Sequence, residues 1–156
     1  YNPVGYVRSA FQSPDGMPIQ PSGNAAAPGV VEILPPFVEG LADLEGFSHV
    51  ILLYHFHSVQ SVQLTITPFL DDETHGVFAT RAPSRPNPIG LSVVKLVKRE
   101  GHVLHIANLD ILDKTPVLDI KPYVPEFDAA PATEIGWLES VQAKVKVKRA
   151  DRRFVR

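Results

Sequence analysis

Short runs of apolar residues, many alternating with polar ones, recur along the chain and predict strands. These strands are expected at residues 2–11, 29–34, 47–56, 60–68, 76–80, 89–98, 102–109, 117–120 and 137–149. The run at 47–56 is almost continuously apolar, which is typical of a central buried strand. Only residues 38–44 show helical spacing, which predicts one short helix.

The order of these elements predicts a mainly β protein, with a single antiparallel β-barrel and one or two short helices. The chain has 15 prolines, which disfavour long helices. A Rossmann fold is not expected, because the GxGxxG fingerprint is absent. Glu100 and Gly101 predict a tight hairpin turn. At 156 residues, we expect one domain spanning 1–156.

The segment 76–94 reads GVFATRAPSRPNPIGLSVV and carries the most distinctive side chains. Its prolines restrict the backbone, so Arg81, Arg85 and Asn87 stand on a stiff connection. Guanidinium groups on such a segment suit a planar or anionic ligand. The alternative is a rigid surface connection whose arginines pair with local carboxylates.

Charge is distributed unevenly along the chain. Residues 1–143 hold 8 basic and 16 acidic residues, whereas residues 144–156 hold 7 basic residues and one acidic residue. This basic end, at about 143–156, predicts contacts with nucleic-acid phosphates or, alternatively, a lysine-protected edge strand. The phosphate-binding candidates there are Lys144, Lys146, Lys148 and Arg149.

Cysteine is absent, which fits a reducing compartment. The sequence shows neither a signal peptide nor an apolar run long enough to cross a membrane. We therefore expect a cytoplasmic protein without membrane contact.

Three histidines cluster in the central apolar run. His49, His55 and His57 would point to one side of an extended strand. A zinc site needs a further ligand, and no suitable acid lies nearby, so no metal is expected. A structural or interface role is the alternative.

Four motifs give the chain a family resemblance. They are FATR with RPNPIGLSVV in the segment 76–94, DILDKTPVLDIKPYVP at 110–125, VGYVRS at 4–9 and GFSH at 46–49. Over residues 4–125 the chain resembles the TrmO/YaeB-like tRNA methyltransferase family. The resemblance implies a β-barrel homodimer that uses S-adenosylmethionine to methylate N6 of threonylcarbamoyladenosine beside the tRNA anticodon.

The resemblance also implies a set of cofactor-binding positions. Ile19 departs from the family's Pro-Arg-Gln segment, so an arginine contact would be missing there. The implied cofactor residues are Pro18, Ile19, Gln20, His57, Ser58, Arg81, Leu91, Ala107, Asn108, Leu109 and Asp110.

Chemistry suggests roles for three of them. Arg81 would hold the methionine carboxylate with its fork of donors. Leu91 would form an apolar wall for adenine or, alternatively, belong to the core. Asp110 would accept hydrogen bonds from ribose hydroxyls or, alternatively, stabilise a turn.

Asp119, Lys121 and Tyr123 share one face if their segment is extended. They would form a substrate cluster, in which Tyr123 stacks on the base, Lys121 meets a phosphate or the threonine carboxylate, and Asp119 accepts a proton. The alternative is an Asp–Lys ion pair beneath the tyrosine. Asn87 could contact an adenine edge, and Arg85 a tRNA phosphate.

A rival function belongs to a different class. The chain would bind S-adenosylmethionine or a nucleotide without catalysis and act through a protein partner. The acidic balance of residues 1–143 favours this rival, whereas the basic end and the cluster around Lys121 favour the enzyme.

Overall fold

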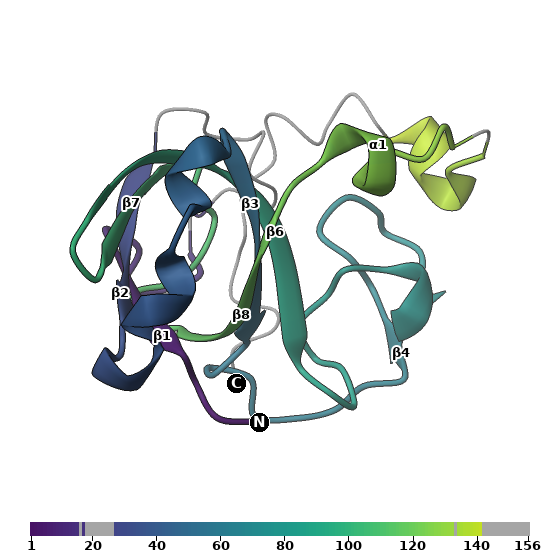
Figure 1. Cartoon of the computed structure of the whole chain (residues 1–156). Coiled ribbons are helices and arrows are strands. Elements are labelled where there is room, and N and C mark those ends of the chain that lie inside the picture. The colour runs from purple at the N-terminus through teal and green to yellow at the C-terminus, as the bar shows by residue number, and fades with distance from the viewer. Residues whose placement is uncertain (16, 18–26, 133, 142–156) are drawn as a thin grey trace.

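A computed structural model of the chain describes residues 1–15, 17, 27–132 and 134–141 (Figure 1). The predicted cofactor positions at 18–20 and the basic positions at 144–149 therefore lie outside the described residues. Among the residues that are described, no helix is both long and apolar enough to span a bilayer.

Six antiparallel strands close into a barrel in the order β1-β2-β7-β6-β3-β8, which confirms the predicted fold class. Closure leaves no unpaired edge in this sheet. The strands are β1 (Gly5–Ser9), β2 (Pro28–Ile33), β3 (His49–His55), β6 (Ile89–Glu100), β7 (Val103–Ala107) and β8 (Pro116–Pro122).

Alternation of buried and more exposed residues, clearest along β3 and β7, builds the barrel interior. On β3, Val50, Leu52 and Tyr54 are buried, while the residues between them are half-buried and face outward. The central position predicted for this strand is confirmed, because β3 pairs with both β6 and β8. The predicted hairpin is also confirmed, since β6 and β7 pair on either side of Gly101, whose φ is 60°.

Residues 56–88, here called the side loop, lie beside the barrel (Figure 1). They hold only a two-stranded sheet, β4 (Thr65–Ile66) and β5 (His75–Gly76), and a 3-10 helix at Val77–Ala79. The strands predicted at 60–68 and 76–80 are thus mostly wrong. The amide of Gln63 donates to the carbonyl of Ser84 instead of to a neighbouring strand.

The remaining elements are short. The predicted helix at 38–44 is a 3-10 helix at Pro35–Leu41, followed by another at Leu44–Gly46. Helix α1 (Pro125–Asp128) follows β8. The strand predicted at 137–149 is wrong over its first residues, because Gly136–Ser140 forms a 3-10 helix.

Candidate functional site

A chain of polar side chains runs from the barrel interior to one of its ends. The Tyr54 hydroxyl lies 3.1 Å from Oγ of Ser92, and that Oγ donates to Oδ1 of Asp110 at 2.7 Å. Tyr54 and Ser92 occupy inward positions on β3 and β6, where they are 5% and 2% exposed. A buried polar group is stable when it is hydrogen-bonded in this way.

The backbone after β7 brings Asp110 to this place. Asn108 has a φ of 63°, a left-handed conformation that turns the chain. Leu109 is then fully buried, and its amide donates to the carbonyl of Ala27 at 3.2 Å. Because the Leu109 side chain belongs to the core, only its backbone is available to a ligand.

The environment of Asp110 changes its acidity. Burial raises the pKa of this carboxyl to about 6, and the Ser92 hydrogen bond, the backbone amide and the positive charge of Arg81 oppose that rise. Burial and the charge of Asp110 also raise the pKa of Tyr54, again against Ser92 and Arg81. The positive charge of Arg81, from the side loop, thus opposes the rise in the pKa of both Asp110 and Tyr54.

Arg85 organises the backbone on both sides of Arg81. Its Nη1 donates to the carbonyls of Thr80 at 2.9 Å, Ala82 at 3.2 Å and Val77 at 3.3 Å. Its guanidinium carbon also lies 5.9 Å from the ring centre of Phe78. The predicted contact between Arg85 and tRNA phosphate would have to coexist with these bonds.

The two ends of the side loop are hydrogen-bonded to each other, next to the barrel strands that they join. The amide of Phe56 donates to the carbonyl of Pro88 at 2.8 Å, and Ser84 is 2% exposed. Asn87 is exposed beside these anchors. The stiffness predicted for this segment therefore has a structural basis, although it does not connect two strands.

His57 lies in a turn after β3, so strand alternation does not place it, contrary to the prediction. Its Nδ1 is 3.2 Å from the hydroxyl oxygen of buried Thr115. Burial and neighbouring His55 lower the pKa of His57, although Asp113 opposes them, so a neutral imidazole is favoured. Ser58 follows it in the same turn. The described part of the chain contains no cluster of three metal-binding side chains.

The outer face of β6 presents apolar side chains. Leu91 is 51% exposed and Ile89 is 40% exposed, so the alternative that Leu91 belongs to the core is wrong. Leu91 pairs across the sheet with Leu53, which in turn pairs with Asp119 on β8. An apolar wall therefore borders a charged position on this face.

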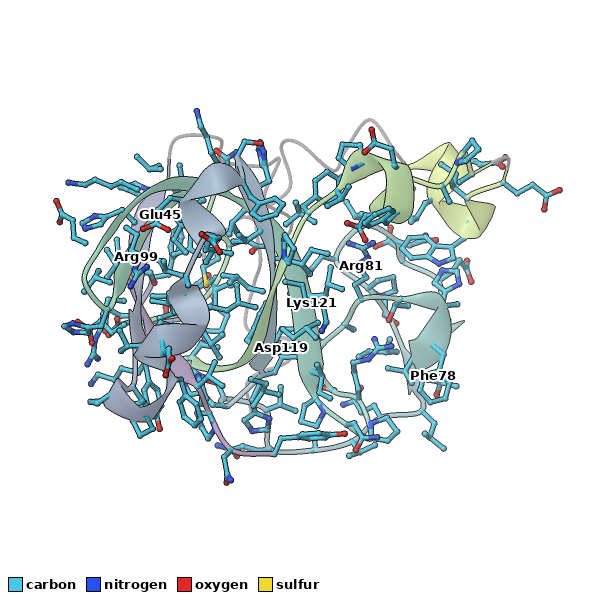
Figure 2. The ribbon with its side chains drawn as sticks, in the orientation of Figure 1. Glu45, Phe78, Arg81, Arg99, Asp119 and Lys121 are labelled. Atoms are coloured by element: carbon cyan, nitrogen blue, oxygen red, sulfur yellow. The ribbon has the colours of Figure 1, made fainter. Side chains whose placement is uncertain are left out.

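Asp119 and Lys121 form an ion pair, with 2.7 Å between Oδ2 and Nζ (Figure 2). Both side chains are about half exposed, so the pair contributes little to stability. Tyr123 packs edge-on against His49, with 6.5 Å between ring centres. The predicted cluster is thus assembled as an Asp–Lys pair and a separate aromatic contact.

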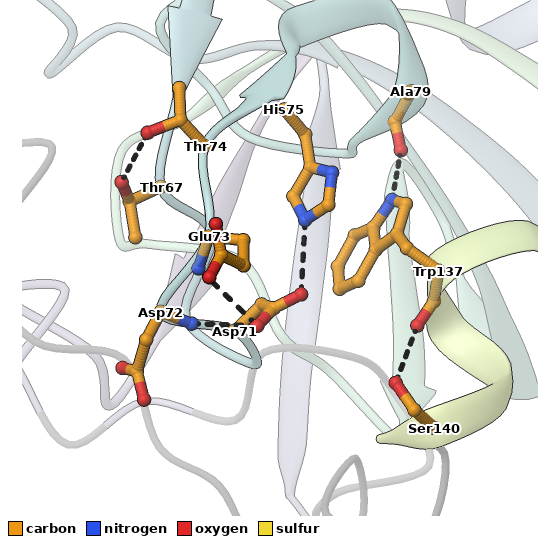
Figure 3. Close-up of polar contacts among 9 residues, drawn as sticks. All are labelled: Thr67, Asp71, Asp72, Glu73, Thr74, His75, Ala79, Trp137 and Ser140. Carbon is orange, nitrogen blue, oxygen red and sulfur yellow. Dashed lines mark hydrogen bonds and ion pairs between the residues drawn. The ribbon is translucent and has the colours of Figure 1, made fainter.

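Trp137, which follows helix α1, contacts the side loop (Figure 3). The sequence did not predict this contact. The indole of Trp137 donates to the carbonyl of Ala79 at 2.8 Å and stacks on His75 with 4.5 Å between ring centres. Nε2 of His75 is 3.0 Å from Oδ2 of Asp71. The segment after α1 is thereby attached to the side loop.

Tyr54 and Ser92 were also absent from the predicted site. The available signal was Ser92 itself, a polar residue within the apolar run IGLSVV. The roles predicted for Arg81, Leu91, Ala107 and Asp110 stay predictions.

Comparison with known proteins places the chain in a family. Residues 6–129 match the model of the tRNA-methyltransferase O N-terminal domain. A probable S-adenosyl-L-methionine-binding protein of Pyrococcus abyssi is 54% identical over 99% of this chain and 84% of its own length. The human tRNA (adenine(37)-N6)-methyltransferase is 40% identical over 81% of this chain, but over only 30% of its own length.

A solved structure agrees with these matches. The crystal structure of TrmO from Pseudomonas aeruginosa superimposes with a TM-score of 0.73 and 46% identity, covering 87% of this chain and 60% of that one. These findings confirm the family that the four sequence motifs indicated. The chain belongs to the tRNA-methyltransferase O family.

Proposed function

We propose that this protein is an S-adenosylmethionine-dependent methyltransferase that modifies N6 of threonylcarbamoyladenosine beside the anticodon of tRNA. The names of its relatives support the cofactor and the class of reaction. The observation that carries the proposal is the largely buried Asp110 carboxylate at the end of the barrel, which accepts a hydrogen bond from Ser92 at 2.7 Å and whose pKa, raised by burial, is opposed in that rise by the positive charge of Arg81 from the side loop.

The predicted cofactor residues have side chains that suit the chemistry of S-adenosylmethionine. Arg81 offers a fork of donors for the methionine carboxylate, and Asp110 offers acceptors for ribose hydroxyls. Leu91 presents exposed apolar surface for adenine. His57 and Ser58 add an imidazole and a hydroxyl at the end of β3. When bound, the cofactor supplies an electrophilic methyl group on a sulfonium.

The chain's own contribution to the reaction is mainly alignment. The adenine N6 lone pair is delocalised, so the nitrogen must be held in line with the methyl group. Such alignment can be worth about 7–11 kcal/mol. Tyr123 and Lys121 would hold the base and a negatively charged group of the substrate. Asp119 and Asn87 are the candidate hydrogen-bond acceptors for N6, and Asp119 would have to exchange its contact with Lys121.

The proposed partners are tRNA and a second copy of the chain. Exposed apolar side chains on the side loop favour self-association, since Val62, Leu64 and Phe78 are 57%, 67% and 77% exposed. The basic residues at 144–149 are proposed to contact tRNA phosphates. We also propose a cytoplasmic location, where tRNA substrates are available.

Methyl transfer tests this function directly. Labelled S-adenosylmethionine is incubated with the full chain and tRNA that carries threonylcarbamoyladenosine, beside the same tRNA with unmodified adenosine. We expect label only in the modified tRNA, at the adenine N6. A variant with alanine at the four basic positions (Lys144, Lys146, Lys148 and Arg149) should need more tRNA for the same rate. Absence of transfer to either tRNA would contradict the proposal.

The second candidate is a non-catalytic S-adenosylmethionine-binding protein that acts through a protein partner. Two observations favour it: the Pyrococcus relative is named only for binding, and residues 1–143 hold twice as many acidic as basic residues. It predicts cofactor binding without methyl transfer to either tRNA. The same experiment, combined with a binding measurement, therefore separates the two candidates.

A further inference from the structure

Two polar side chains occupy inward positions in a barrel that is otherwise lined mainly by aliphatic residues. Ser92 and Tyr54 are almost fully buried, and the inward positions next to them hold Val50, Leu52 and Val94, each 0% exposed. A valine at position 92 would fill the barrel without a hydroxyl group, whose burial is costly unless it is hydrogen-bonded. The hydroxyl of Ser92 therefore has a role beyond packing.

The hydrogen bonds that connect Tyr54, Ser92 and Asp110 all run in one direction. A carboxylate only accepts, so the single hydroxyl proton of Ser92 is donated to Oδ1 of Asp110 at 2.7 Å. The Tyr54 hydroxyl, 3.1 Å from the same oxygen of Ser92, must then be the donor to it. The two hydroxyls thus deliver one directed hydrogen bond to the Asp110 carboxylate.

A glycine makes room for this arrangement. Tyr54 pairs with Gly90 across β3 and β6. A Cβ atom at position 90 would lie 2.3 Å from Cε2 of the Tyr54 ring, closer than atoms can approach. The missing side chain therefore allows the ring to lie over β6 and its hydroxyl to reach Ser92, one inward position further along.

The hydrogen bond from Ser92 orients the Asp110 carboxylate. A hydrogen bond to Oδ1 restricts rotation of the carboxylate, and this fixes the direction in which Oδ2 accepts. Among the described residues, the positive charge of Arg81 from the side loop opposes the rise that burial causes in the pKa of this carboxyl, and the carboxylate in turn adds to burial in raising the pKa of the Tyr54 hydroxyl from β3. In the described part of the chain, Ser92 is the side chain that donates a hydrogen bond to the Asp110 carboxylate.

We propose that Ser92, supported by Tyr54, is a positioning residue that holds the Asp110 carboxylate in the orientation in which it accepts from the ribose hydroxyls of S-adenosylmethionine. This inference rests on the proposed function, because that function assigns Asp110 to the ribose. The inference adds that residues inside the barrel, and not only those at its end, help to set the position of the cofactor.

The first test needs no cofactor. The carboxyl carbon of Asp110 is followed by NMR as the pH changes, with Asp110→Asn identifying the signal. We expect a pKa near the raised value of about 6 in the unchanged protein. Loss of the donor in Ser92→Ala should raise this pKa further, by about one unit. Ser92→Thr keeps a hydroxyl and should restore it.

The second test measures affinity for S-adenosylmethionine by calorimetry at neutral pH. Ser92→Ala should weaken binding about tenfold, which corresponds to one hydrogen bond to a charged group. Ser92→Thr should recover most of the loss. In an Asp110→Asn background, Ser92→Ala should add no further loss, because the group that it positions is gone.

Two results would overturn the inference. One is a titration of Asp110 that is the same in Ser92→Ala and in the unchanged protein. The other is a loss of affinity in Ser92→Ala that is fully additive with that of Asp110→Asn, since additivity indicates independent effects. Circular dichroism and urea unfolding of each variant show whether the barrel is intact.

Failure of the proposed function has a different signature. If the unchanged protein does not bind S-adenosylmethionine, the proposed function and the cofactor part of this inference are both contradicted. The titration still decides whether Ser92 controls the Asp110 carboxylate.

Discussion

The barrel and the side loop are stabilised by different interactions. In the barrel, alternating apolar residues of six strands pack into one core. In the side loop, the buried apolar cluster is only Ile66 and Ala82 with partly buried Phe69. Polar contacts to backbone groups hold the rest, above all those of Arg85 and Trp137.

This difference matters because the proposed cofactor site takes one charged group from each region. Asp110 follows a barrel strand and is fixed from inside the barrel, whereas Arg81 stands on a turn held by hydrogen bonds. We therefore expect changes in the barrel to alter global stability and changes in the side loop to alter cofactor binding.

The largest expected effect is the loss of a core side chain. Leu52→Ala, at a 0% exposed position, should reduce the free energy of unfolding by about 2–5 kcal/mol. Ile66→Ala in the side loop should cost less than about half of that, because its small cluster can open locally. Urea unfolding measures both. Equal costs would show that the two regions form one cooperative unit.

The next effect compares two glycines. Gly90→Ala should destabilise the barrel by about 1–3 kcal/mol, because the new methyl group overlaps the Tyr54 ring. Gly76→Ala in the side loop should be nearly neutral, since nothing lies within 4 Å of the added atom and its φ is −61°. Thermal unfolding that does not distinguish these variants would contradict the close packing of Tyr54 on Gly90.

Arg85→Ala should weaken S-adenosylmethionine binding about tenfold while changing the free energy of unfolding by less than about 1 kcal/mol. The reason is that the carbonyls before and after Arg81 lose their shared donor. Arg8→Ala is the matched control, because Arg8 is an exposed arginine paired with Glu32 on the barrel. Unchanged affinity in Arg85→Ala would show that the turn keeps its shape without this residue.

The smallest effect concerns the contact between Trp137 and His75. The hydrogen bond from His75 holds the pKa of Asp71 below its ordinary value of 3.8. A lowered pKa means that this stabilisation is present at neutral pH and is lost as the pH falls through the lowered value. Because Trp137 is the only tryptophan, its fluorescence should shift to longer wavelength in that range.

Two controls accompany the acid titration. Circular dichroism should show the barrel still folded where the fluorescence changes. Asp71→Asn removes the titrating group and should abolish the acid step. A fluorescence change that coincides with barrel unfolding would show that the contact has no separate transition.

The barrel could be predicted from the sequence because every second residue of a barrel strand faces the core, which leaves an alternating apolar pattern. The side loop could not, because Val62 and Leu64 alternate like strand residues yet are largely exposed. No long strand of the described residues pairs with them, and the backbone there pairs with Ser84 and Val77 instead. Local pattern alone does not reveal whether a partner strand exists.

Prediction of the site was limited in a similar way. Family motifs identified Arg81 and Asp110, and the positive charge of Arg81 opposes the rise in the pKa of the buried Asp110 carboxyl. Ser92 and Tyr54 were missed because their importance depends on facing the barrel interior together, which requires the register of β3 against β6. The stacking of Trp137 on His75 joins residues from distant parts of the chain, and no local pattern predicts it.

The most direct test of a cofactor site shared by the barrel and the side loop is calorimetric titration with S-adenosylmethionine. The unchanged protein should bind it, Arg81→Ala should bind at least about tenfold more weakly, and Arg8→Ala should bind normally. Binding by the unchanged protein that Arg81→Ala leaves intact would contradict this location of the site.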